Sequence, residues 1–235
     1  MRRKGNGPGA SIFASIFENL RRSLRGVDNA RAGAIPVGEA LHPLALAAVA
    51  LLVVNDWALK PLAVPGSAAG AITGKLSDVA GLAFAPVALS AAIGLLLHGA
   101  ARLGARVDPS LSRGRLLACI AATGAGFAAV KLSPALAASV AGWLSHLGRP
   151  ARFYDDLTDL LALPALYAAL WIGKDELRRV PLGRAAAILR LGRPAAAALA
   201  DVRWAGAPAA RVAALAAALD GRDIDRAEAL LTSVG

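Results

Sequence analysis

Apolar and polar residues follow one another along this chain in long blocks rather than at the close spacing of an amphipathic helix or strand. Four of the blocks are predominantly apolar over the roughly 20 residues that a helix needs to cross a bilayer. They run from about Ala40 to Leu59, from about Asp78 to Ala101, from after Arg115 to Lys131, and from about Leu157 to Ile172. The pattern predicts an all-α, polytopic membrane protein with four transmembrane helices.

A fifth apolar stretch, Pro134 to Leu147, leaves an alternative open. If it crossed the membrane, the chain would have five spans and its C-terminal tail would lie outside. Its shortness and its leading proline favour an interfacial or re-entrant helix, whose free backbone groups protein or water must satisfy.

The flanks of the apolar blocks suggest three regions. Residues 1–39 form a basic N-terminal segment in which Ser11 to Arg25 is predicted to be an amphipathic interfacial helix. Residues 40–172 form the transmembrane domain, and residues 173–235 form a basic helical tail. The tail is predicted to end in a helical hairpin, because Asp220-Gly221 interrupts its apolar periodicity and Asp223 is placed to cap the second helix.

Composition supports a membrane protein. Hydrophobic residues make up 57% of the chain, whereas ordinary soluble domains contain about 45–50%. The single cysteine, Cys119, lies in an apolar stretch and is interpreted as a packing residue. The three histidines, His42, His98 and His146, lack metal-ligand spacing and are interpreted as anchors at the membrane edges.

The distribution of positive charge predicts the topology. The net charge is +10, and Lys and Arg number seven in residues 1–40, four in residues 99–115 and ten in residues 173–235. Positive residues in short loops stay cytoplasmic, so both termini are expected in the cytoplasm. The basic excess therefore indicates topology rather than nucleic-acid binding, and the Ala-, Arg- and Gly-rich composition suggests the inner membrane of a GC-rich bacterium.

The two segments expected outside carry the other five cations and five aspartates. They are Lys60, Lys75, Lys131, Arg149, Arg152, Asp56, Asp78, Asp155, Asp156 and Asp159. An ionised group that adjoins an apolar span is costly unless it is paired or hydrated. Such residues are either functional or structural ion pairs, and in both cases the helix ends that carry them should converge.

The leading hypothesis assigns these charges to a site for a polar or anionic headgroup, such as that of an envelope lipid or its precursor. Lysine and arginine would hold phosphate, and the aspartates would orient them. The predicted binding residues are Asp56, Lys60, Lys75, Asp78, Lys131, Arg152 and Asp159. The partners are then the lipid bilayer and a headgroup ligand, with a cytosolic protein at the C-terminal hairpin as a further candidate.

Two alternatives belong to other classes. Asp155, Asp156 and Asp159 are spaced like the aspartate-rich motifs that hold Mg²⁺-diphosphate in prenyl-transferring enzymes, which would make the protein a Mg²⁺-dependent enzyme acting on lipid diphosphates. No cofactor is expected outside that alternative. The other is a non-catalytic assembly subunit. Because the sequence has no nucleophile elbow or zincin motif, a non-enzymatic role is favoured.

Two short motifs resemble those of the VanZ-like membrane proteins. Lys75-Leu76-x-Asp78 opens the second span, and Arg152 precedes Asp159-Leu160-Leu161-Ala162 at the start of the fourth. In the family, a D-K-x-x-H motif begins one helix and an R-x-F-x-x-x-D-x-x-A-N motif precedes a later one. The resemblance covers roughly residues 40–172 and implies a four-helix bacterial membrane protein related to glycopeptide response. Asp78 replaces the family's histidine and Leu163 its asparagine.

Overall fold

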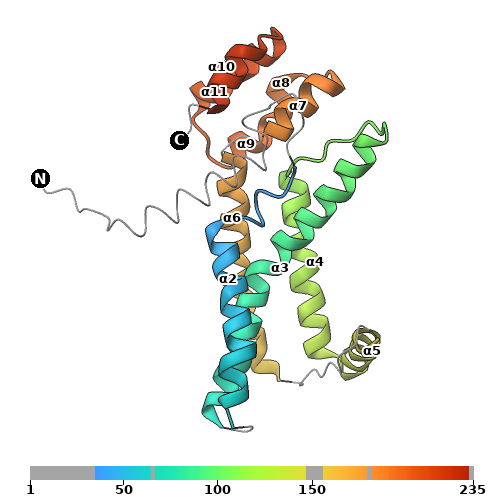
Figure 1. Cartoon of the computed structure of the whole chain (residues 1–235), viewed down its shortest axis with the longest axis vertical. Coiled ribbons are helices and arrows are strands. Elements are labelled where there is room, and N and C mark those ends of the chain that lie inside the picture. The colour runs from blue at the N-terminus through green and yellow to red at the C-terminus, as the bar shows by residue number, and fades with distance from the viewer. Residues whose placement is uncertain (1–34, 65–66, 147–155, 179–181, 233–235) are drawn as a thin grey trace, which may run out of the picture. The chain divides into compact units, whose positions relative to one another are not determined.

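The computed structural model describes residues 35–64, 67–146, 156–178 and 182–232. Within these ranges the regular elements are helices, and no strand occurs (Figure 1). The expected interfacial helix from Ser11 to Arg25 lies outside the described residues.

The chain divides into two compact units. The spanning unit comprises Leu44–Ser90 and Gly114–Ile172, and the terminal unit comprises Met1–Pro43, Ala91–Arg113 and Gly173–Gly235. Helices α3 (Ala68–Arg102) and α6 (Leu166–Arg178) contribute residues to both units.

Among the described residues, four helical segments are long and apolar enough to cross a membrane, as the sequence predicts. The first is α2 (Pro43–Val54) continued by the π-helical turn η2 (Asn55–Leu59) and the 3₁₀ turn η3 (Lys60–Leu62). The second is α3 and the third is α4 (Arg113–Leu132). The fourth joins the 3₁₀ helix η4 (Leu157–Ala165) to α6.

The fifth apolar stretch, for which the sequence leaves two alternatives open, forms a separate short helix, α5 (Pro134–Ser145), of 12 residues. At 1.5 Å per residue such a helix is about 18 Å long, well short of the roughly 30 Å hydrocarbon core. It does not qualify as a fifth span.

The helix that contains the predicted second span starts ten residues before Asp78, because α3 begins at Ala68. The hydroxyl of Ser67 accepts a hydrogen bond from the Gly70 N–H at 3.1 Å and donates to Val64 O at 2.6 Å, which starts the helix. The alanines that follow propagate it through the polar residues Thr73 to Asp78. Lys75 and Asp78 therefore lie one turn apart on a helix instead of in a loop.

Apolar contacts in the spanning unit are small and local. Ala45 of α2, Val87 of α3, and Ala169 and Ile172 of α6 form one buried cluster. On α4, a Cβ at Gly124 would lie 2.8 Å from Leu166 Cδ1, so glycine permits close packing of α4 against α6. Cys119 is buried, which confirms its interpretation as a packing residue.

The terminal unit contains a conventional helical core. Its C-terminal helices are α7 (Leu182–Leu191), α8 (Ala195–Ala198), α9 (Ala200–Trp204), α10 (Ala209–Asp220) and α11 (Ile224–Thr232). Leu199, Val202 and Leu215 are at most 1% exposed at its centre. Asp223 Oδ1 accepts a hydrogen bond from the Arg226 N–H at 3.1 Å, as an N-cap does.

One histidine departs from its interpretation as an anchor at the membrane edge. His42 is buried in the terminal unit, and its Nε2 lies 3.3 Å from Asp175 Oδ2. An imidazole that has a carboxylate partner can be removed from water.

Candidate functional site

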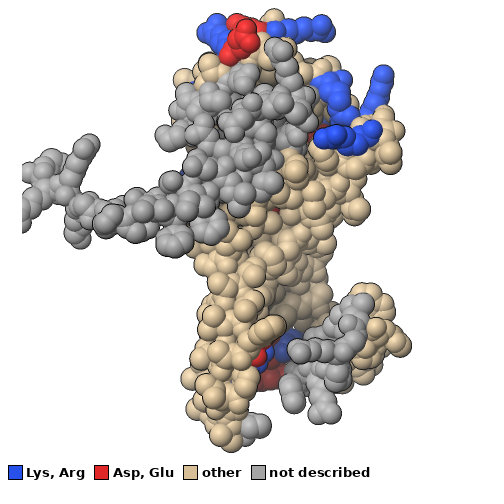
Figure 2. All heavy atoms as spheres, in the orientation of Figure 1, with Lys and Arg blue, Asp and Glu red and all other residues tan. Residues whose placement is uncertain are grey.

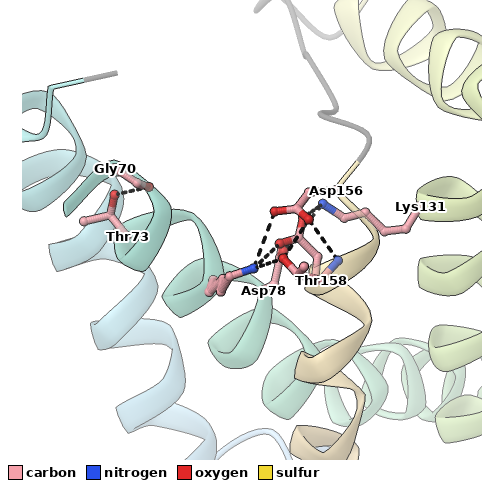
Figure 3. Close-up of polar contacts among 8 residues, drawn as sticks. Gly70, Thr73, Asp78, Lys131, Asp156 and Thr158 are labelled. Atoms are coloured by element: carbon pink, nitrogen blue, oxygen red, sulfur yellow. Dashed lines mark hydrogen bonds and ion pairs between the residues drawn. The ribbon is translucent and has the colours of Figure 1, made fainter. Parts of the chain in front are cut away.

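The charged residues predicted from the sequence gather at one end of the spanning unit. The C-terminal end of the first segment, the N-terminal end of α3, the C-terminal end of α4 and the N-terminal end of η4 meet there. Figure 3 shows α3, α4 and η4 each contributing side chains to this cluster. The expected convergence of the helix ends is therefore present in the structure.

Five of the charges form a series in which carboxylates and ammonium groups alternate, which we call the central chain. Its order is Asp78, Lys131, Asp159, Lys75, Asp156. Lys131 Nζ lies 3.5 Å from Asp78 Oδ2 and contacts Asp159 Oδ2 directly. Lys75 Nζ lies 3.2 Å from Asp159 Oδ1 and 3.5 Å from Asp156 Oδ2. Each ammonium group thus has two carboxylate partners.

Exposure rises along the central chain from Lys131 to Asp156. The Lys131 and Asp159 side chains are 9% and 11% exposed, whereas those of Lys75 and Asp156 are 39% and 50% exposed. A nearly buried ion pair must keep its partners, because an unpaired buried charge is costly. The Lys131–Asp159 pair is therefore suited to holding α4 and η4 together, and the Lys75–Asp156 pair is open to other molecules.

A short capping loop fixes the exposed end of the central chain. Asp156 Oδ1 accepts hydrogen bonds from the Thr158 backbone N–H at 2.9 Å and from the Thr158 hydroxyl at 2.6 Å. These bonds, that of the hydroxyl foremost, hold the pKa of Asp156 below its usual value. Lys75 Nζ donates to the same hydroxyl oxygen. Asp156 is thus ionised at neutral pH and N-caps η4.

A further ion pair, separate from the central chain, lies on the first spanning segment. Asp56 Oδ1 and Lys60 Nζ are 2.7 Å apart, one turn from each other, and both side chains are about 40% exposed. The hydroxyl of Ser77 on α3 donates to Asp56 Oδ1 at 2.8 Å. This bond connects the Asp56–Lys60 pair to α3 at Ser77, the residue that precedes Asp78 of the central chain.

Asn55 is a site residue that the sequence analysis missed. Its side chain is completely buried, and its Nδ2 donates to Thr73 O and to the Ser77 hydroxyl, both at 2.7 Å. A carbonyl can only accept, so this contact assigns the amide nitrogen to that side. The other side, Oδ1, has no hydrogen-bond partner among the described residues. In the sequence, the signal for Asn55 is a polar amide that directly follows an apolar run. In the structure, Asn55 begins a π-helical turn, and such turns are frequent at functional sites.

Six of the seven predicted binding residues lie in this cluster: Asp56, Lys60, Lys75, Asp78, Lys131 and Asp159. The seventh, Arg152, and the predicted metal ligand Asp155 lie outside the described residues. Thr158 and Ser77, which the sequence analysis did not select, supply hydroxyl groups that connect the charged side chains.

The described residues of the cluster do not present the donor set of a metal centre. Within the described part of the chain, no group of three His, Cys, Asp or Glu side chains could hold a metal ion. Asp156 and Asp159 instead share the ammonium group of Lys75. Magnesium prefers an all-oxygen shell that includes water, whereas the two described carboxylates of the aspartate-rich motif both pair with a lysine.

Comparison with family models, with curated proteins and with solved structures gave no match to this chain. The VanZ-like resemblance therefore stays a prediction from two short motifs, and the function must be argued from the geometry of the cluster.

Proposed function

We propose that the protein is a multi-pass protein of a bacterial inner membrane that binds a polar lipid headgroup at the charged end of its spanning unit. The headgroup best suited to this end carries both a phosphate and an ammonium group. Envelope lipids and their precursors include such headgroups.

The charge of the described cluster supports a zwitterionic ligand over a purely anionic one. Four carboxylates (Asp56, Asp78, Asp156, Asp159) accompany three ammonium groups (Lys60, Lys75, Lys131), so the described cluster carries a net charge of −1. The ammonium groups already have carboxylate partners, which weakens their attraction for a further anion.

The observation that carries the proposal is the presence of two half-exposed ion pairs, Lys75–Asp156 and Lys60–Asp56. In each pair a donor and an acceptor lie side by side at the surface. A phosphate can accept from the lysine while an ammonium group donates to the aspartate, and such charge-assisted hydrogen bonds are the stronger ones. The nearly buried Lys131 holds the helices that present these pairs.

The distribution of Lys and Arg supports a topology with both termini in the cytoplasm. If all four segments cross the membrane, both termini and the α3–α4 connection lie on one side. That side carries 21 of the 26 Lys and Arg residues, which supports a cytoplasmic location for it and an outer-leaflet location for the charged cluster.

The Mg²⁺-dependent enzyme is less well supported. Lys75 pairs with Asp156 and Asp159, which are the two described carboxylates of the aspartate-rich motif. A role in glycopeptide response rests on the VanZ-like resemblance alone.

The test is lipid retention by the full-length protein, measured by native mass spectrometry in detergent. Phosphatidylethanolamine, phosphatidylcholine and phosphatidylglycerol are added separately. The double variant Lys75→Gln/Asp156→Asn removes one charge of each sign and leaves the net charge unchanged. Its matched control, Arg222→Gln/Asp225→Asn, does the same on the exposed hairpin of the terminal unit. Circular dichroism and gel filtration verify folding.

We expect phosphatidylethanolamine to bind best, because its ammonium group can donate hydrogen bonds to the aspartates. The variant should weaken its binding about tenfold or more, which corresponds to the loss of one or two charge-assisted hydrogen bonds, and the control should not. The proposal fails if phosphatidylglycerol is the preferred lipid and the same variant releases it, or if the variant retains phosphatidylethanolamine unchanged.

A further inference from the structure

A second charged surface lies in the terminal unit, at the connection between α3 and α4. Arg102 ends α3, Arg106 follows in the connection, and Arg190 reaches the connection from α7. His98 on the last turns of α3 lies within electrostatic range of both Arg102 and Arg190. Figure 2 shows Lys and Arg side chains grouped beside this end of α3. We call this surface the arginine patch.

The arginines of the patch differ from the lysines of the central chain in having no carboxylate partner among the described residues. Within the described part of the chain, no ion pair joins Arg102, Arg106 or Arg190 to an aspartate or glutamate. The nearby Asp108 is engaged instead by the buried Arg184, with 3.2 Å between its Oδ2 and Arg184 Nη1. The patch therefore retains its positive charge.

The connection that carries the patch is held in place. Arg190 donates to the carbonyl oxygens of Ala105, at 3.3 Å, and Val107, and Arg184 donates to Leu111 O at 2.6 Å. Gly104, with φ of +95°, ends α3 in the left-handed conformation, and the Ala105 N–H bonds back to Ala100 O at 3.0 Å. Carbonyl groups satisfy the donors of Arg190 without neutralising its charge. Binding to this surface therefore needs little ordering of the backbone.

An apolar side chain projects from the middle of the patch. Leu103 is 91% exposed and lies between Arg102, at the end of a membrane-spanning segment, and Arg106. Exposure of leucine to water at this position is unfavourable. A leucine flanked by arginines matches the boundary between acyl chains and headgroups, where the leucine enters the apolar layer and guanidinium groups bind phosphate.

We propose that the arginine patch binds the phosphate of an anionic phospholipid in the leaflet at this end of α3. Arg102 and Arg106 contact the phosphate, Arg190 adds positive charge, and Leu103 inserts beside the acyl chains. Arginine suits this role because its planar guanidinium can bind phosphate in a bidentate manner. The proposal is independent of the zwitterionic site, because it concerns other residues and a different lipid.

The test is a titration of the full-length protein in detergent with phosphatidylglycerol, with phosphatidylcholine as the neutral reference, followed by native mass spectrometry. The variant Arg102→Gln/Arg106→Gln removes two charges from the patch. The matched control, Arg222→Gln/Arg226→Gln, removes two exposed charges from the hairpin of the same unit. A third variant, Leu103→Ser, keeps every charge. Inorganic phosphate serves as a competitor.

We expect the patch variant to weaken phosphatidylglycerol binding by about tenfold or more, since each basic residue near an anionic headgroup contributes substantially. The control should keep the affinity, Leu103→Ser should lower it severalfold, and added salt should weaken binding by the protein with an intact patch more than by the patch variant.

Equal losses in the patch variant and its control would overturn the proposal, because they would indicate attraction by overall charge. Unchanged binding in the patch variant would also overturn it. If inorganic phosphate displaces the lipid at equal concentration, the surface binds free anions and the lipid assignment is wrong. Should Arg102→Gln/Arg106→Gln fail to fold, Arg102→Lys/Arg106→Lys keeps the charge and is expected to lose affinity through the lost bidentate contacts.

Discussion

The two units of this protein stabilise their helices in opposite ways. In the spanning segments, only 11% to 39% of the residues in each apolar window are buried inside the protein, and Trp57 and Leu161 are more than three-quarters exposed. In the terminal unit, Leu199, Val202 and Leu215 are at most 1% exposed. The terminal helices bury a core as helices in water do, whereas the spanning helices leave their apolar surface to a lipid solvent.

The charged cluster of the spanning unit and the arginine patch of the terminal unit also use charge differently. The spanning unit brings Lys131 and Asp159 together where both are nearly buried, so the helix ends are joined by ion pairs. The arginine patch of the terminal unit is exposed and lacks described carboxylate partners. A helix bundle that gains little from apolar contacts depends more on polar contacts at its ends.

The largest effect is expected from Lys131→Met. This variant leaves Asp159 and Asp78 without their shared ammonium group, and breaking a nearly buried pair in this way costs about 3–5 kcal/mol. Lys60→Met, at a half-exposed pair, should cost less than about 1 kcal/mol. Thermal unfolding of the purified protein, followed by circular dichroism, measures both. If the two variants lost equal free energy of unfolding, the burial of the Lys131–Asp159 pair would add nothing to its contribution to stability.

The next effect concerns apolar burial. Leu199→Ala in the terminal core should destabilise the protein by about 2–5 kcal/mol, because it leaves a cavity. Leu161→Ala should have little effect, because that side chain is 79% exposed and packs against detergent or lipid. The same unfolding measurement compares them. A cost at Leu161 as large as that at Leu199 would contradict the division into lipid-solvated and self-packed units.

A smaller effect is expected at the turn that ends α3. Gly104→Ala should cost about 1 kcal/mol, because alanine is strained at φ of +95°. Gly99→Ala is the control, because a Cβ there would meet nothing within 4 Å and alanine favours a helix. Chemical denaturation of both variants measures the difference. If Gly99→Ala destabilises more than Gly104→Ala, the turn does not hold the arginine patch in place.

The smallest effect is a pH dependence at Asp156. Its folded-state pKa lies below the ordinary 3.8, so its stabilising contribution is complete above pH 3.8 and is lost as pH falls further. The difference in melting temperature between the wild type and Asp156→Asn should therefore shrink only below about pH 4. Melting curves recorded from pH 6 to pH 3 measure it, and a difference that grows on acidification would contradict the capping geometry.

Much of this architecture could be predicted from the sequence, because bilayer length is a strong constraint on apolar blocks. The four spanning segments and the gathering of six charged residues at one end of the spanning unit are examples. The start of α3 could not be predicted from the sequence, because the polar run from Thr73 to Asp78 is typical of a loop. Its helical structure includes a hydrogen bond from Asn55 of the first segment to Thr73 O, and the sequence does not reveal that contact. The alternation of charges along the central chain also depends on which helix ends become neighbours, and one chain's pattern does not specify this.

The claim that the charged helix ends share the outer face of a membrane is tested most directly by cysteine labelling in spheroplasts. In a Cys119→Ala background, single cysteines replace Ala69, which is exposed near the start of α3, Ala151, and Arg222 on the exposed hairpin of the terminal unit. A membrane-impermeant thiol reagent should label positions 69 and 151 in intact spheroplasts and position 222 only after lysis. Labelling of 69 or 151 only after lysis would contradict the account, because the two charged segments could not then form one outer site.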